Sequence, residues 1–204
     1  MKRIIGLSYI WNSILVGILV GILTVIGQAY LPGNFNSLAN SGAIWLIPAY
    51  FIGLSFSGAK QSIISCILCL VNSVFGYYFF ESIWNSHTFI FFSYHIFLWM
   101  ICAVIAGTIF GLAANIAKTS KNSFYNSAGK AMLPAVFMAE GLNILFHKKD
   151  YLHMINVGYA WIVISFILVI VIYKKNIFKK ESVLSLILAT ALGLFFYQLL
   201  FIIA

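Results

Sequence analysis

Acidic residues are almost missing from this chain: only four of its 204 residues are aspartate or glutamate, and all charged residues together make up 8%. A soluble domain carries about 25% charged residues. So few charges cannot cover the surface of a folded domain in water. Cysteine is equally scarce, and Cys66, Cys69 and Cys102 all lie inside apolar runs, so they say nothing about the redox compartment.

Hydrophobic residues fill the space instead, at 63% of the chain and a mean hydropathy of +1.03. No soluble core could bury this much apolar surface, so we predict an all-α, polytopic transmembrane helix bundle that forms a single domain over residues 1–204. A spanning helix needs about 20 apolar residues. Seven stretches qualify, namely 5–30, 42–58, 61–80, 89–117, 131–147, 153–173 and 182–203. The second and fifth are short and contain Pro48 and Pro134.

The basic residues predict an orientation. With the N-terminus in the cytoplasm, ten of the twelve fall in inner segments and only Lys148 and Lys149 lie outside. This asymmetry favours seven spans, N-in and C-out, over a six-span alternative in which span five is merged or lost. With six spans the lysines of 174–180 would lie outside and the asymmetry would disappear. The net charge of +8 then reports topology and contact with anionic lipid in loop 118–130, and nucleic acid is not an expected partner.

Span one is too long for a signal peptide and is expected to remain. A composition rich in Ile, Phe, Asn and Lys is typical of a low-GC bacterial genome, which favours the plasma membrane.

Small residues recur at helical spacing within several spans. Residues three or four apart share a helix face, and small side chains let helices approach closely in lipid. We therefore expect these positions to pack helix against helix. With the polar residues on the same stripes, they are Gly17, Gly21, Thr24 and Gln28 in span one, Ser62, Ser65, Cys69, Asn72 and Gly76 in span three, Gly107, Gly111 and Asn115 in span four, and Thr190, Gly193 and Tyr197 in span seven.

Glu140 is the one acid within a predicted span. A carboxylate at the bilayer centre costs about 2.5–3.5 kcal/mol, so such residues usually face the bundle interior and serve a function. Asn143 and His147 follow on the same face, and span five is therefore expected to lie inside the bundle or to line a cavity. The structural alternative is a protonated Glu140 that is hydrogen-bonded to Asn72, Asn115 or a backbone carbonyl.

Buried polar residues concentrate toward the predicted outer side, which suggests a cavity that opens to the exterior. An aromatic belt with polar helix ends is the alternative, and it accounts for Tyr30, Trp45, Tyr77, Tyr78, Trp84 and Tyr151, but not for Glu140 or Gln28. The predicted substrate-binding residues are Glu140, Asn143, His147, Gln28, Asn72, His95 and Asn40.

The first outer loop carries a recognisable pattern. Asn40 or Ser41 could cap the short, proline-containing span two, a combination typical of discontinuous transporter helices. An ordinary capped hairpin between spans one and two is the alternative. Leu31-Pro32-Gly33 followed by Ala39-Asn40-Ser41-Gly42-Ala43-x-Trp45 resembles the opening signature of an uncharacterised bacterial integral-membrane family. That resemblance implies the architecture and no mechanism. In layout alone, the chain is also similar to the substrate-binding components of energy-coupling-factor vitamin transporters, which usually have six spans.

Motifs of catalysis and metal binding do not occur. The chain has no P-loop, no G-x-G-x-x-G, no G-x-S-x-G and no H-E-x-x-H, and Cys66-x-x-Cys69 lies within an apolar helix where a thiol is inert. We expect no catalytic residues, metal or cofactor. The leading hypothesis is a small-molecule or lipid binding protein or permease with an outward-opening site around Glu140. A scaffold or regulatory subunit with a membrane-protein partner is the alternative, and an intramembrane enzyme is the third.

Overall fold

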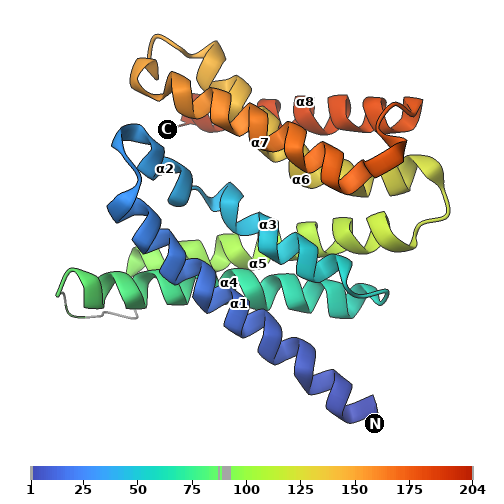
Figure 1. Ribbon diagram of the computed structural model, residues 1–204, viewed down its shortest axis with the longest axis horizontal. Coiled ribbons are helices and arrows are strands. Elements are labelled where there is room, and N and C mark those ends of the chain that lie inside the picture. The colour runs from blue at the N-terminus through green and yellow to red at the C-terminus, as the bar shows by residue number, and fades with distance from the viewer. Residues whose placement is uncertain (1, 87, 89–92, 204) are drawn as a thin grey trace. The chain divides into compact units, whose positions relative to one another are not determined.

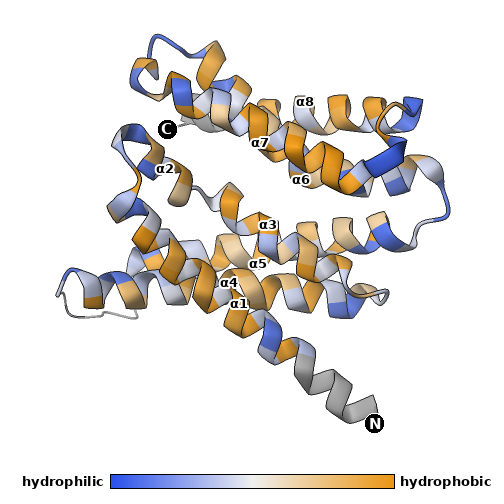
Figure 2. Cartoon of the chain, in the orientation of Figure 1, coloured by the Kyte–Doolittle hydropathy of each residue, from blue (hydrophilic) through white to orange (hydrophobic). Residues whose placement is uncertain are grey.

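The computed structural model describes residues 2–86, 88 and 93–203, and the side chains of residues 9–86, 88 and 93–198. This part of the chain is helical, and it contains seven helical segments that are long and apolar enough to cross a membrane. The prediction of an all-α bundle with about seven spans is therefore confirmed, whereas its orientation stays a prediction. Figure 2 shows hydrophobic residues along the helices and hydrophilic residues gathered mainly at their ends and connections.

Eight α-helices form these segments, because the second crossing is built from two helices and a 3₁₀ turn (Figure 1). Their bounds are α1 Lys2–Tyr30, α2 Asn36–Ala39, α3 Gly42–Leu54, α4 Ala59–Trp84, α5 Tyr94–Thr119, α6 Ser123–Phe146, α7 Ile155–Tyr173 and α8 Lys180–Ile203. The contacts divide the chain into two compact units, residues 1–115 and 116–204, and the boundary falls within α5.

In the first unit, α1 packs most extensively against α4, and small residues make this contact possible. A methyl group added at Gly21 would meet the backbone nitrogen of Tyr77, and one added at Gly76 would come within 2.9 Å of the Ile18 Cα atom. Gly107 of α5 approaches Ile67 of α4 in the same way, at 2.7 Å. The predicted stripes on spans one, three and four therefore pack against each other within this unit.

The second crossing is interrupted at Asn40 and Ser41, whereas Pro48 lies within the continuous helix α3 and does not break it. The chain leaves helical geometry at Asn40, and α3 begins again behind Ser41, whose hydroxyl accepts a hydrogen bond from the Ala43 backbone N–H at 3.2 Å. α3 has 13 residues, about 20 Å of helix, which is shorter than a hydrocarbon core of about 30 Å. The 3₁₀ turn Gly33–Phe35 and α2 complete the crossing.

In the second unit, α6 is the central helix and packs against both α7 and α8. Its contact with α7 is close, because a methyl group at Gly141 would meet the Gly158 carbonyl oxygen at 2.7 Å. Two buried hydrogen bonds fix α7 on α6: the Ser165 hydroxyl donates to the Pro134 carbonyl, and the Tyr173 hydroxyl donates to the Ser127 carbonyl, each at 2.7 Å. Of the apolar window in α6, 56% is buried, against 17–39% for the other spans.

The prediction that span five is short was wrong. The helix begins at Ser123, eight residues before the predicted start at 131, and the basic connector predicted for 118–130 shrinks to a few residues. Asn122 sets the start, since its side-chain oxygen accepts hydrogen bonds from the backbone N–H groups of Phe124 and Tyr125. Other predicted ends differ from the observed ones by at most four residues, and the predicted start of span four at 89 lies outside the described residues.

Candidate functional site

Glu140 on α6 has a partner on α8. The hydroxyl of Tyr197 donates a hydrogen bond to the Glu140 side chain, and both residues are partly buried. The approach of the two helices accounts for the pairing, because Gly193, one turn before Tyr197, leaves room for Ala139 of α6. A methyl group at Gly193 would meet the Ala139 Cβ at 2.8 Å. The intramembrane acid is therefore held by a neutral donor from a neighbouring helix.

Asn143 lies one turn beyond Glu140 on α6 and is only 8% exposed. Its side-chain oxygen is buried and has no hydrogen-bond partner among the described residues. The backbone carbonyl of the same residue accepts a hydrogen bond from the His147 ring Nδ1 at 3.1 Å. A buried acceptor without a partner costs about 1–3 kcal/mol. We refer to Glu140, Asn143, His147 and Tyr197 as the Glu140 centre.

A second polar centre lies in the first unit, where two adjoining cavities open between α3, α4 and α5. One measures about 110 Å³ and is lined by Asn40, Gly42, Trp45, Tyr77, Tyr78 and Trp99. The other measures about 170 Å³, shares Gly42, Trp45 and Trp99 with the first, and continues along apolar residues such as Leu70 and Val74. We call the first cavity the aromatic pocket and the second its apolar extension.

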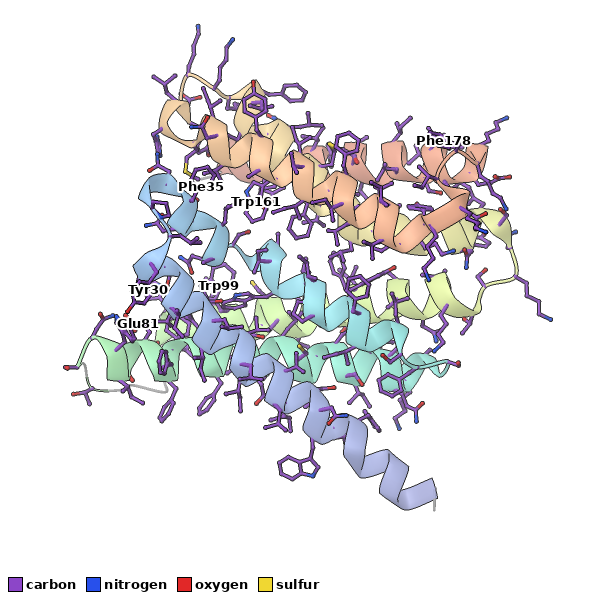
Figure 3. The ribbon with its side chains drawn as sticks, viewed as in Figure 1. Tyr30, Phe35, Glu81, Trp99, Trp161 and Phe178 are labelled. Carbon is purple, nitrogen blue, oxygen red and sulfur yellow. The ribbon has the colours of Figure 1, made fainter. Side chains whose placement is uncertain are left out.

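Two of the predicted residues border the aromatic pocket. Asn40 lines it directly, and Gln28 of α1 donates a hydrogen bond to the hydroxyl of Tyr77. The Trp45 ring lies 5.9 Å from the Tyr77 ring, and the Tyr77 and Tyr78 rings meet edge to face at 4.9 Å. Figure 3 shows Trp99 of α5 and Glu81 of α4 at the same end of the first unit as Tyr30.

The remaining two predicted residues join neither centre in the contacts that they make. Asn72 donates its side-chain N–H to the Leu68 carbonyl of its own helix at 2.7 Å, and this is a packing role. His95 is exposed near the start of α5, and its ring meets Tyr94 edge to face. The seven predicted residues therefore divide between two units, with Glu140, Asn143 and His147 in one and Gln28, Asn40, Asn72 and His95 in the other.

Several residues of these centres were not predicted as binding residues. Tyr197 stood in the sequence as part of a packing stripe, and Trp45, Tyr77 and Tyr78 as part of an aromatic belt. Trp99 carried no signal beyond its residue type, because only the fold brings α5 beside α3. Among the described residues, no three His, Cys, Asp or Glu side chains gather as a metal site would require.

The fold and the two polar centres define a multi-pass helical membrane protein. The chain belongs to DUF6518, a family of unknown function, whose pattern matches residues 6–203. No curated protein and no solved structure matches it. The family has no assigned function, as expected, whereas the resemblance drawn from the Leu31-Pro32-Gly33 signature and the likeness to energy-coupling-factor components stay predictions.

Proposed function

We propose that this protein binds a small molecule or a lipid within the membrane, as a binding component or a permease, and that Glu140 is the central polar group of the site. The proposal is carried by the pairing of Glu140 with Tyr197 beside Asn143, whose buried carboxamide oxygen lacks a partner among the described residues. A ligand with a hydrogen-bond donor would satisfy that oxygen and gain from the neighbouring carboxylate. Hydrogen bonds to a charged group contribute about 1.5–3 kcal/mol.

The predicted topology supports an approach from outside. α6 would run outward, which puts Glu140 and Asn143 in the outer half of the membrane. The predicted outward bias of the polar side chains would then bring a ligand to this helix from the exterior. In cells, we expect the plasma membrane of a bacterium to hold the protein.

The scaffold alternative stays open, but the small-residue stripes no longer point to a partner. It rested on small-residue stripes in spans one, three and four, which were available to a partner only if the chain itself did not use them. Gly21, Gly76 and Gly107 instead pack within the first unit, against Tyr77, Ile18 and Ile67. The enzyme alternative requires a second catalytic group beside Glu140. Tyr197 is the candidate for that group, and activity measurements on Tyr197→Phe would test it.

The test is a ligand screen by thermal stability. The purified full chain is heated with and without each compound of a panel of small metabolites and lipids, and the compounds that stabilise it are titrated. A ligand at about 100 times its dissociation constant stabilises by about 2.7 kcal/mol. For compounds that bind, we expect Glu140→Gln and Tyr197→Phe to weaken the affinity by roughly ten- to hundred-fold, the loss of one charge-assisted hydrogen bond.

Two exposed residues supply matched controls. Asp150→Asn removes a carboxylate from the connection after α6, and Tyr159→Phe removes a phenol hydroxyl from a residue that is 57% exposed. Both variants should bind as the wild type does. If Glu140→Gln also binds every stabilising compound with wild-type affinity, the proposed role of Glu140 is lost.

A further inference from the structure

Four aromatic rings converge on the aromatic pocket from three helices. Trp45 comes from α3, Tyr77 and Tyr78 from α4, and Trp99 from α5. Trp45 is 7% exposed and therefore fixed, whereas Trp99 is 45% exposed and borders the opening. The faces of aromatic rings carry partial negative charge, so a cavity lined by several rings can stabilise a cation that lies against those faces.

A carboxylate adds a full negative charge to this end of the unit. Glu81 follows Tyr77 by one helical turn on α4, and its charge acts on the hydroxyls of both Tyr77 and Tyr78. One of its oxygens accepts a hydrogen bond from the Asn85 side chain at 2.8 Å. Because that amide is uncharged, it does not cancel the charge of the carboxylate. Glu81 is the only acid in residues 1–115.

No lysine or arginine of the same unit can neutralise Glu81. The basic residues of this unit are Lys2, Arg3 and Lys60, and Lys60 stands 21 positions before Glu81 on α4, about 32 Å along the helix axis. Lys2 and Arg3 lie at the start of α1. The other end of this helix, at Tyr30, contacts Trp84 near Glu81, so both basic residues lie a helix length away from Glu81. Helix dipoles largely cancel here, because α1 and α4 end at this side while α3 and α5 begin at it.

The adjoining cavity indicates the remainder of the ligand. The apolar extension is reached past Gly42, Trp45 and Trp99, and its other lining residues are almost all apolar: Leu46, Leu70, Val74, Cys102, Ala103 and Ala106. A ligand that fills both cavities would therefore have a compact positive group in the aromatic pocket and an uncharged, apolar substituent in the extension.

We propose that the aromatic pocket binds an organic cation of the quaternary ammonium class, with its head enclosed by Trp45, Tyr77, Tyr78 and Trp99 near Glu81 and its apolar substituent in the extension. This site is built from residues of the first unit and the Glu140 centre from residues of the second, so each can be tested with its own variants. Quaternary ammonium suits the pocket because its charge is spread over methyl groups that need no hydrogen-bond acceptor.

Calorimetric titration of the purified full chain in lipid nanodiscs tests the proposal, at pH 8 where histidine is neutral. The probes are tetramethylammonium, butyltrimethylammonium, choline and dimethylbutanol, the last being the uncharged isostere of choline with carbon in place of nitrogen. We expect choline to bind and dimethylbutanol to bind at least ten-fold more weakly. Butyltrimethylammonium should exceed tetramethylammonium by about four-fold for each additional buried methylene.

Three variants locate the site. Trp99→Leu removes a wall of the aromatic pocket and should weaken tetramethylammonium binding by about two- to thirty-fold. Glu81→Gln should also weaken it, by less than about five-fold, because Glu81 does not line the cavity and five-fold is the effect of a unit charge at about 4 Å in water. The matched control is Trp84→Leu. Trp84 is 46% exposed at the end of α4 and contacts Tyr30 and Phe80 rather than the cavity. The Trp84→Leu variant should bind tetramethylammonium with wild-type affinity.

The proposal is overturned if none of the cations binds up to about 10 mM, beyond the millimolar end of the affinity scale. It is also overturned if dimethylbutanol binds as well as choline, if Glu81→Gln leaves the affinity unchanged, or if Trp84→Leu and Trp99→Leu lose it equally. The comparison of choline with its isostere uses the wild-type protein alone, so it decides the charge preference even if a variant fails to fold.

Discussion

A buried hydrogen bond anchors Trp45. Its indole N–H donates to the Thr24 hydroxyl at 2.8 Å, and that hydroxyl in turn donates to the Val20 carbonyl at 2.9 Å. Thr24 and Trp45 are 3% and 7% exposed, so the environment offers no water to replace either bond. This link between α1 and α3 holds one wall of the aromatic pocket in place.

Thr24→Val keeps the shape of the side chain and leaves the indole N–H without its acceptor. We expect a loss of about 1–3 kcal/mol in the free energy of unfolding, read as a lower midpoint when the detergent-solubilised protein is heated and the folded fraction is measured by size exclusion. Thr108→Val is the matched control, because Thr108 is exposed and its hydroxyl bonds only the Val104 carbonyl of its own helix. Equal midpoints for the two variants would contradict the role given to Thr24.

Sequence alone can find a residue such as Glu140, because an acid in an apolar span is rare by composition. It cannot find the partner of that residue. Tyr197 lies 57 positions further along the chain and meets Glu140 only because Gly193 lets α8 approach α6. The same limit applies to Asn72, whose polarity suggested a binding role while its side chain bonds its own helix.

At the scale of helices, hydropathy and capping residues predicted most crossings to within a few positions, and α6 shows where they fail. Residues 123–130 are too polar to read as a span in lipid, yet Ser127 and Gly129 are buried within the second unit. These two residues are surrounded by protein rather than by lipid. A hydropathy window measures how well a segment partitions into lipid, so it misplaces the start of this helix. The start of span two at Gly42 was predictable because Asn40 and Ser41 are capping residues, whereas Pro48, which suggested a break, lies within the continuous helix α3.

The contact between α1 and α4 gives a prediction for a whole helix pair. Gly21→Ala inserts a methyl group among the backbone atoms of Ser73, Gly76 and Tyr77, which cannot move as a flexible side chain could. Overpacking of this kind costs about 1–3 kcal/mol, so a lower thermal midpoint is expected. Gly42→Ala is the control, since its methyl group would meet only the Trp99 ring at 3.9 Å. A midpoint for Gly21→Ala at or above that of Gly42→Ala would show that α1 and α4 do not meet through Gly21.

At the scale of the whole molecule, the number of crossings followed from apolar length, whereas the assembly of the aromatic pocket did not. Its walls come from α3, α4 and α5, and which helices become neighbours depends on close contacts such as Gly111 against Ile63. Hydropathy carries no information on those contacts. The uneven distribution of lysine does carry information on orientation, and that prediction can be tested directly.

Single cysteines at the connections between helices test the orientation. In a Cys102→Ala background, Asn34→Cys and Lys148→Cys are expected to react with a membrane-impermeant maleimide on intact cells, and Lys121→Cys and Lys175→Cys only after the cells are opened. The background protein without an added cysteine is the control, because Cys66 and Cys69 are fully buried. Lys175→Cys decides the most: with six spans it would face outward, and labelling on intact cells would overturn both the N-in, C-out orientation and the outward placement of the Glu140 centre.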